Sequence, residues 1–334
     1  MNYRDIIQKN CAEISPLAKY AFHYSDILNI QSILLSGRLY SRSVAKKLNL
    51  MQNDNASRQV IDMTNDDITK SVRFYFRPLT PTQYHNEGYK HPSVRYDRDT
   101  NANVPVPIFL VFDLEKLLNL EKTRFSECSQ AGFGCPLCST ITEFSQFDFE
   151  KIYSIDPYQY KEFKHAEIIY PEMFDIDICL KYIVCRNEVD KESLLNLLKE
   201  NQNVYKKYKS KVIVSKKERT LFYKNGLCIE DCLYHNGVLN VVFSESNERR
   251  KYAERYLTRI ELEKLSSLDF KVELTWDNGH KGFCQNKVDY LKFKLLSIKI
   301  PIYKDASELE IKAYLEGNLL CSLKRVLNQV ELIS

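Results

Sequence analysis

Polar and aromatic side chains that could bind a ligand gather at three places in the first half of the chain. In residues 22–42, His23 and Ser25 lead into an apolar helical pattern. Residues 74–89, FYFRPLTPTQYHNEGY, crowd hydrogen-bonding groups behind three aromatic rings. Glu167 begins the apolar stretch EIIYP. A carboxylate that enters a strand is usually a surface residue, so none of the three indicates catalysis by itself.

The common enzyme signatures are absent from the sequence. Its nine glycines form no GxGxxG and no GxxxxGK, which argues against a Rossmann dinucleotide site and a P-loop. There is no HExxH, no GxSxG and no zinc-deaminase pattern. Any nucleotide must be held in another way.

The ten cysteines are expected to be free thiols in a chain that has no apolar leader, because cytosolic reductants keep thiols reduced. Cys135 and Cys138 form a CPLC pair, with Cys128 upstream. This could be half of a zinc site, but the next pair, Cys228 and Cys232, follows only about ninety residues later. We therefore expect core or loop cysteines and no metal.

Length and composition favour a two-domain globular protein. The 334 residues are 44% hydrophobic, enough to bury a sizeable core. No apolar run reaches the length of a membrane span, so we expect a cytoplasmic protein without membrane contact.

The net charge of +4 is unevenly distributed along the chain. Residues 201–334 hold 24 Lys and Arg against 17 Asp and Glu, and residues 205–219 are especially lysine-rich. Such a stretch can attract a polyanion, although a solvated linker is an equally good interpretation. We place the domain boundary here, giving domains 1–204 and 205–334.

Hydrophobic patterns in the first domain predict mixed helices and strands. A helix is expected to end at Gly37, a buried strand to occupy 107–112 before a short helix, and short strands to lie in HAEIIYP and CLKYIVC. DKESLLNLLKE predicts a helix with Asp190 as N-cap.

The second domain is predicted to be a smaller β-rich α+β module. A hairpin is expected around His235, Asn236 and Gly237, because Asn-Gly between apolar strands favours a type I′ turn. RRKYAERYLTRIELEKLSSL predicts one long helix, and FKVELTW predicts a strand.

Read together, the three polar clusters resemble the DarT-like ADP-ribosyltransferases, bacterial toxins that modify DNA bases. FHYSDILNIQSILLSGRL is similar to the family's H-F-T-H-x-x-N-L-x-x-I-L-x-x-G-L block, with Ser25 for Thr and Asp26 for the second His. FYFRPLTPTQY resembles its F-Y-F-x-P-R-S/T-P-M-x-Y block, and KHAEIIYP its closing A-E block. The resemblance covers about residues 18–200.

The resemblance implies an α+β fold with a split mixed sheet and NAD⁺ as substrate. Glu167 would stabilise the sugar cation that forms when nicotinamide leaves, and could also take a proton from the attacking base. Tyr75 or Phe76 would stack on nicotinamide, and the prolines would stiffen a loop that presents Tyr84. The remaining residues implied to bind NAD⁺ are His23, Tyr24, Ser25, Asn29, Gly37 and Arg42.

One position departs from the family pattern. Leu79 stands where the family has an arginine after the first proline, and Thr82 replaces a methionine. Arg77, two residues earlier, could assume the arginine's catalytic role, or Arg42 could. Alternatively, activity is weakened or lost.

The implied acceptor is a base in single-stranded DNA, in a toxin–antitoxin or phage-defence setting with a macrodomain antitoxin. RNA is an alternative acceptor, and a protein is a weaker one. Aromatic residues between 114 and 163 could grip a base, although most should be core. The rival hypothesis is a nucleic-acid-binding protein on a catalytically decayed transferase fold.

Overall fold

The computed structural model describes residues 2–11, 15–51, 66–96, 99, 103–130, 135–156, 159–215 and 221–327. Some residues named above lie outside this part. They are Lys216, Lys217 and Arg219 of the lysine-rich stretch, and Phe133 and Tyr158 of the aromatic residues expected to contact a base.

Contacts divide the chain into two compact units. The first comprises residues 1–85, 108–184 and 220–222, and the second comprises 86–107, 185–219 and 223–334. This division differs from the single boundary expected after residue 204, because the chain enters the second unit more than once.

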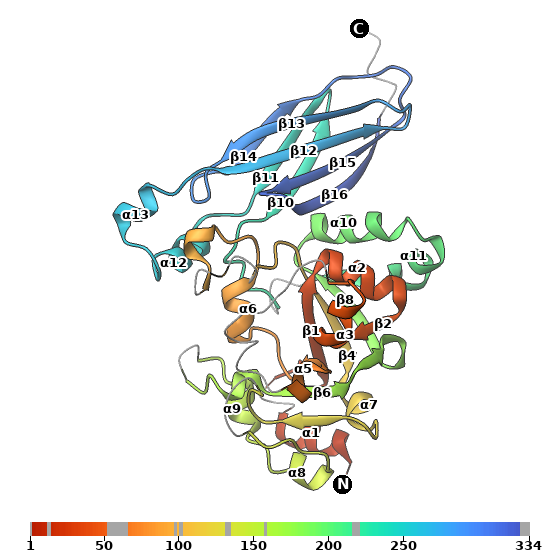
Figure 1. Cartoon of the computed structure of the whole chain (residues 1–334), viewed down its shortest axis with the longest axis vertical. Coiled ribbons are helices and arrows are strands. Elements are labelled where there is room, and N and C mark those ends of the chain that lie inside the picture. Colours follow the sequence, from red (N-terminus) through yellow and green to blue (C-terminus); the bar gives the residue numbers. More distant parts are fainter. Residues whose placement is uncertain are drawn as a thin grey trace. The chain divides into compact units, whose positions relative to one another are not determined.

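The first unit is built on a large sheet (Figure 1). Its strands lie in the order β5 (Arg124–Ser126), β6 (Glu167–Pro171), β3 (Ser71–Tyr75), β1 (Tyr20–Asp26), β4 (Pro107–Asp113) and β8 (Leu180–Cys185). A small antiparallel sheet pairs β2 (Arg38–Tyr40) with β7 (Met173–Asp175). The helices are α1 (Tyr3–Cys11), α2 (Ile27–Ser36), α3 (Arg42–Lys47), α5 (Asp66–Thr69), α6 (Pro81–Asn86), α7 (Leu114–Leu118), α8 (Ile141–Phe144) and α9 (Phe149–Tyr153). The strands and helices confirm the expected α+β class.

Helix α2 shows how sequence signals place the first polar cluster. Asp26 caps the helix by accepting a hydrogen bond from the Leu28 amide at 3.2 Å. The helix buries its apolar side and ends at Gly37, whose φ of 68° suits a residue without a side chain. The predicted helix end is confirmed, as are the strand and short helix after residue 107.

Aromatic residues between 114 and 163 mostly form core, as expected. Those buried are Phe125, Phe144, Phe147, Phe149 and Tyr153, and several of their rings meet edge to face. Tyr160 is 43% exposed, so it remains available for a ligand.

The second unit contains two antiparallel sheets, drawn in cyan and blue in Figure 1. One has the order β10 (Ile229–His235), β11 (Val238–Phe243) and β14 (Leu295–Lys299). The other has the order β13 (Lys281–Val288), β12 (Leu268–Trp276), β15 (Glu308–Leu315) and β16 (Asn318–Val326). The unit also contains β9 (Val212–Val214), α10 (Glu188–Leu198), α11 (Gln202–Tyr208), α12 (Asn247–Ala253) and α13 (Arg259–Glu263). Short 3₁₀ turns across both units are Pro92–Val94, Phe163–His165, Ile176–Ile178 and Lys209–Lys211.

Helix α10 packs on β16, and its start differs from the prediction. Asn187 is the N-cap and accepts from the Asp190 amide at 2.9 Å. Asp190 lies in the first turn of the helix, where it forms a buried ion pair with Arg186 at 3.0 Å. The prediction of Asp190 as N-cap was wrong because Asn187, three residues earlier, caps the helix with its side chain.

The hairpin prediction is confirmed, but the long-helix prediction is wrong. β10 and β11 pair around Asn236 and Gly237, both with positive φ. The expected long helix is instead α12 and α13, because Thr258 starts a new helix through a capping box with Glu261.

Many lysines of the four-stranded sheet are paired with acids. The ion pairs are Lys271–Glu273, Lys287–Asp269, Lys312–Glu310 and Lys324–Glu308. This sheet therefore offers less positive charge to a polyanion than its lysine content implies. Within the described residues, no helix is long and apolar enough to span a membrane.

Candidate active site

Strand register brings residues that are far apart in the sequence to one place. β3 pairs antiparallel with both β1 and β6, so Tyr75 lies between Phe22 and Glu167. Residues directly opposite each other on neighbouring strands project to the same face. Arg73, two residues before Tyr75, projects to that face as well.

Glu167 and Arg73 form a two-pronged ion pair. Arg73 Nε donates to Glu167 Oε2 at 2.5 Å, and Arg73 Nη2 donates to Oε1 at 2.9 Å. Glu167 is fully buried, whereas a quarter of the Arg73 side chain is exposed. Burial by itself lowers the pKa of Arg73, but the Glu167 carboxylate raises it above its usual value. Arg73 is therefore a permanent cation held against a buried carboxylate.

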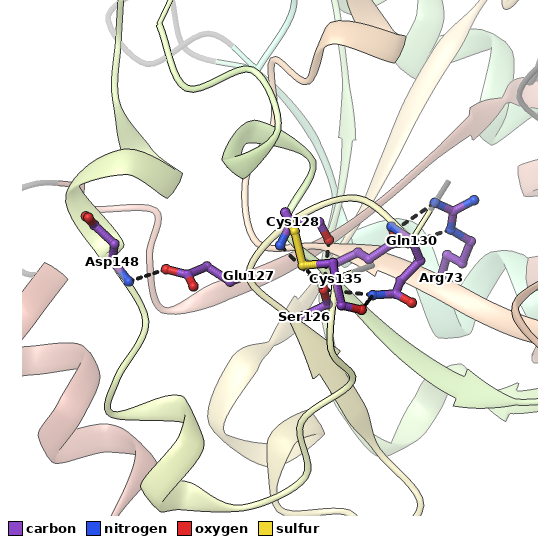
Figure 2. The surroundings of a disulfide bond; sticks show 8 residues. Arg73, Ser126, Glu127, Cys128, Gln130, Cys135 and Asp148 are labelled. Atoms are coloured by element: carbon purple, nitrogen blue, oxygen red, sulfur yellow. Dashed lines mark hydrogen bonds and ion pairs between the residues drawn. A yellow bond between two sulfur atoms is a disulfide. The ribbon is translucent and has the colours of Figure 1, made fainter. Parts of the chain in front are cut away.

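A third donor completes the surroundings of the carboxylate. The Gln130 backbone N–H donates to Glu167 Oε1 at 2.6 Å. The Gln130 side chain amide donates to Ser126 Oγ and to the Cys135 carbonyl, each at 2.9 Å. Figure 2 shows Gln130 beside Arg73 and next to the Cys128–Cys135 disulfide.

The disulfide corrects the expectation that every cysteine is a free thiol. Cys128 and Cys135 are bonded, while Cys138 is free and partly buried. The pairing was not predictable because the sequence does not show that the two Cα atoms lie 6.1 Å apart. Among the described residues, no group of three or more His, Cys, Asp and Glu side chains is arranged to hold a metal ion.

Tyr75 is buried on the same face of the sheet as Arg73 and Glu167. Burial is the largest cause of the raised pKa of Tyr75, and Glu167 raises it further, whereas the positive charges of Arg73 and Arg42 lower it. The phenol is thus neutral at pH 7.

His23 lies on the adjacent strand, and its ring faces away from this cluster. The ring meets Phe74 edge to face at 6.4 Å, and Phe74 projects from the face of β3 opposite to Tyr75. His23 Nδ1 donates to the Arg73 carbonyl at 3.0 Å, which leaves Nε2 as an acceptor in the neutral ring. Burial lowers the pKa of His23, so the ring is neutral at pH 7.

The other predicted residues of the first cluster build the turn from β1 into α2. Asn29 Nδ2 donates to Ser25 Oγ at 3.1 Å, and both side chains are buried. Tyr24 projects to the other side of β1 from Ser25 and packs its ring on Phe109 at 5.1 Å. Gly37 accepts from the Ile176 amide at 3.1 Å through its carbonyl. These contacts hold the element together, and any part in binding NAD⁺ stays a prediction.

The segment after β3 differs in part from its predicted role. Phe76 is fully buried and stacks on Phe144, so its ring packs in the core, and its part in binding NAD⁺ stays a prediction. Tyr84 lies in the short helix α6 instead of the expected loop. Leu79, where the family has arginine, has φ of 59°, and its amide donates to Gln83 Oε1 at 2.7 Å.

Arg77 contacts the backbone of a neighbouring segment. Its Nη1 donates to the carbonyls of Ile152 and Ser154 at 2.8 and 2.7 Å, and its Nε donates to the Pro78 carbonyl at 3.1 Å. These bonds tie the end of α9 to the end of β3. Its predicted catalytic role has no support in these contacts.

Arg73 and Gln130 are the residues that sequence reasoning missed. The alternation in SVRFY contained a signal for Arg73, since it places Arg73 and Tyr75 on one face of the strand. No local signal pointed to Gln130, because its contact with Glu167 is made by a backbone amide.

His165 adjoins the cluster from the 3₁₀ turn Phe163–His165, and its titration gives a testable pH dependence. Burial, followed by the positive charges of Arg73 and His85, lowers its pKa from 6.5 to about 4. The unfolded chain therefore binds one more proton than the folded chain between these values. We expect the free energy of unfolding to fall by at most ~1.4 kcal/mol per pH unit as pH drops from about 6.5 to 4.

Urea unfolding of the protein and of His165→Gln across this pH range measures the effect. The variant should show a shallower dependence, by up to one proton. Identical slopes would mean that His165 titrates normally in the folded chain.

A comparison with models of known families identifies the family of this chain. A family model described as ssDNA thymidine ADP-ribosyltransferase, DarT, matches residues 22–218. The match covers more than half of the chain, so the protein is an NAD⁺-dependent ADP-ribosyltransferase. The chain belongs to the DarT family.

Solved structures that match part of this chain include proteins named DarT and DarTG. Thermus sp. 2.9 DarT in complex with ADP-ribosylated ssDNA has 19% identity and a TM-score of 0.49, over 62% of this chain and 98% of that chain. The same protein with carba-NAD⁺ has 18% identity and a TM-score of 0.47, over 63% and 100%. Thermosipho africanus DarTG in complex with ADP-ribose has 14% identity and a TM-score of 0.44, over 65% and 53%. No curated protein matches the chain.

Proposed function

We propose that the protein transfers ADP-ribose from NAD⁺ to thymidine in single-stranded DNA, with Glu167 as the catalytic carboxylate. The description of the family carries the acceptor. The observation that carries the catalytic assignment is the buried Glu167–Arg73 pair beside Tyr75. We assign to Arg73 the role that the sequence suggested for Arg77, because Arg73 is the arginine that contacts the Glu167 carboxylate.

The proposed roles follow from the charge that develops during transfer. Nicotinamide leaves with the electrons of its bond to ribose, and the sugar becomes positively charged. A carboxylate close to the ribose stabilises that charge, and it can accept the proton that the attacking base nitrogen loses. Arg73 positions Glu167 through two charge-assisted hydrogen bonds. Tyr75 would stack on nicotinamide, with Arg42 near the phosphates.

The first cluster keeps its proposed part in binding NAD⁺. Because the His23 ring faces away from the Glu167 cluster, its proposed contact with nicotinamide and ribose is made through its backbone groups. Ser25, Asn29 and Gly37 shape the backbone around it.

An acceptor panel tests the proposal. Labelled NAD⁺ would be incubated with a thymidine-containing single strand, with the same strand carrying deoxycytidine at each thymidine, with the duplex and with the matching RNA. We expect label only on the first strand, because a paired base is not accessible to the site. Label on RNA would favour the alternative acceptor. Binding to DNA without any label would support the decayed-fold hypothesis, which the leucine at position 79 favours.

We also propose that the biological setting is a toxin–antitoxin pair with a macrodomain-type antitoxin. A macrodomain hydrolase should remove the label from the DNA strand and restore an unmodified oligonucleotide. A label that resists every macrodomain hydrolase tested would argue against this partner.

A further inference from the structure

The second unit contains a buried arginine with two unpaired hydrogen-bond donors. Arg249 lies in α12 and has no exposed surface. Its Nη1 donates to the carbonyls of Ser244 and Glu245 at 3.0 and 3.4 Å and to Ser244 Oγ at 2.8 Å. Its Nε and Nη2 have no partner among the residues that the structure describes. Because a buried donor on a charged group is costly without an acceptor, an acceptor is expected here.

Two other arginines show what this edge of a guanidinium binds. Nε and Nη2 point to the same side and can hold an oxyanion by two hydrogen bonds. Arg73 uses them for Glu167, and Arg186 uses them for Asp190 at 3.0 and 3.2 Å. Burial lowers the pKa of both arginines, but the facing carboxylate raises it above its usual value. In Arg249, burial lowers the pKa more than the neighbouring groups raise it. Its positive charge is therefore poorly neutralised.

Lys90 brings a second buried basic group to the same side of α12. Arg249 and Tyr252 are three residues apart on this helix and so share one side of it. Lys90 Nζ lies 4.1 Å from the centre of the Tyr252 ring and donates to Asn225 Oδ1 at 2.5 Å. Burial lowers the pKa of Lys90 well below its usual value; Glu87 raises it, and Arg249 lowers it again. An anion next to both basic groups would favour their charged forms.

Two buried carboxylates of the second unit are bound to other donors. Asp190 is paired as described above, and Glu87 accepts from the backbone amides of Tyr223 and Lys224 at 2.9 and 2.7 Å. An ion from solution can supply both acceptors and negative charge to Arg249, whereas a buried water supplies acceptors alone. Because protein covers the Arg249 side chain, only a small ion can be enclosed there, which excludes a nucleic-acid backbone.

We propose that the second unit binds a small tetrahedral oxyanion of the phosphate class, held by Nε and Nη2 of Arg249 with Lys90 beside it. Phosphate matches the two-donor edge as a carboxylate does and carries more negative charge, which suits two basic groups. The ion connects the segment around Lys90 to α12, so its binding stabilises the folded unit. Its role is structural and separate from ADP-ribosyl transfer.

Equilibrium dialysis of the full chain against labelled inorganic phosphate, at constant chloride concentration, tests the site. We expect saturable binding that sulfate displaces, because sulfate has the same shape and its oxygens can accept the same two hydrogen bonds. AMP should not displace the label, since a nucleotide is too large to be enclosed around Arg249. Displacement by AMP would place the phosphate in a nucleotide site and overturn the proposal.

Three variants locate the bound ion. Arg249→Met should weaken phosphate binding by at least about 10-fold, because it removes both donors. Arg249→Lys should weaken it as well, since lysine keeps the charge and loses the two-donor edge. Arg250→Met is the matched control: it removes the same charge from the next residue of α12, which is exposed, and should leave phosphate binding unchanged. If Arg249→Met does not fold, Arg249→Lys takes its place.

Unchanged phosphate affinity in the folded Arg249 variants would overturn the site. So would the absence of phosphate binding to the unchanged chain, because water would then be the acceptor for both donors. Phosphate binding is measured without DNA or NAD⁺, so a failure of the proposed transfer to thymidine would leave these results unaffected.

Discussion

Glu167→Gln is expected to reduce ADP-ribosyl transfer to single-stranded DNA by about 10²–10⁴-fold, because the neutral amide can neither stabilise the sugar cation nor accept a proton. Its –NH₂ would also face the donors of Arg73 and Gln130, so some loss of stability is expected. Initial rates per folded molecule, with the folded fraction taken from urea unfolding, separate the two effects.

Glu172→Gln is the matched control for this prediction. Glu172 follows the end of β6 and is exposed, so its replacement removes the same charge five residues away from Glu167. We expect this variant to keep its activity. Equal activity in both variants would show that Glu167 is a structural residue, and a loss in both would point to a general effect of charge.

Arg73→Met is expected to lower the free energy of unfolding by about 3–5 kcal/mol and to abolish transfer, because it leaves the buried Glu167 carboxylate without its ionic partner. The double variant Arg73→Met/Glu167→Gln should be less destabilised than the sum of the two single variants, since no buried charge remains. Urea unfolding of the three variants measures this coupling.

Arg77→Met distinguishes the two arginines. This change removes hydrogen bonds to the Ile152, Ser154 and Pro78 carbonyls and should cost stability. Activity per folded molecule should persist, because these hydrogen bonds hold the backbone at the ends of β3 and α9. If Arg77→Met abolishes transfer while Arg73→Met does not, the prediction of Arg77 from the sequence is correct and the assignment of Arg73 from the structure is wrong.

Several elements were predictable because their causes are local. The end of α2 at Gly37 follows from a backbone conformation that glycine adopts most easily. The hairpin at Asn236 and Gly237 follows from turn chemistry, and β4 from a continuous apolar run. The predicted helix boundaries were wrong where another side chain capped the helix. Thr258, for example, caps α13 and so divides the expected long helix in two.

The sequence by itself determined the family and pointed to Glu167, because three ordered blocks of residues are specific in combination. Only the tertiary structure decided which arginine meets this carboxylate. Arg73 and Glu167 are 94 residues apart, and strand register alone brings them together. Register likewise sends the His23 ring to the opposite face from Tyr75. The Cys128–Cys135 pairing and the Gln130 contact with Glu167 depend on distances in space, which residue types and spacing do not encode.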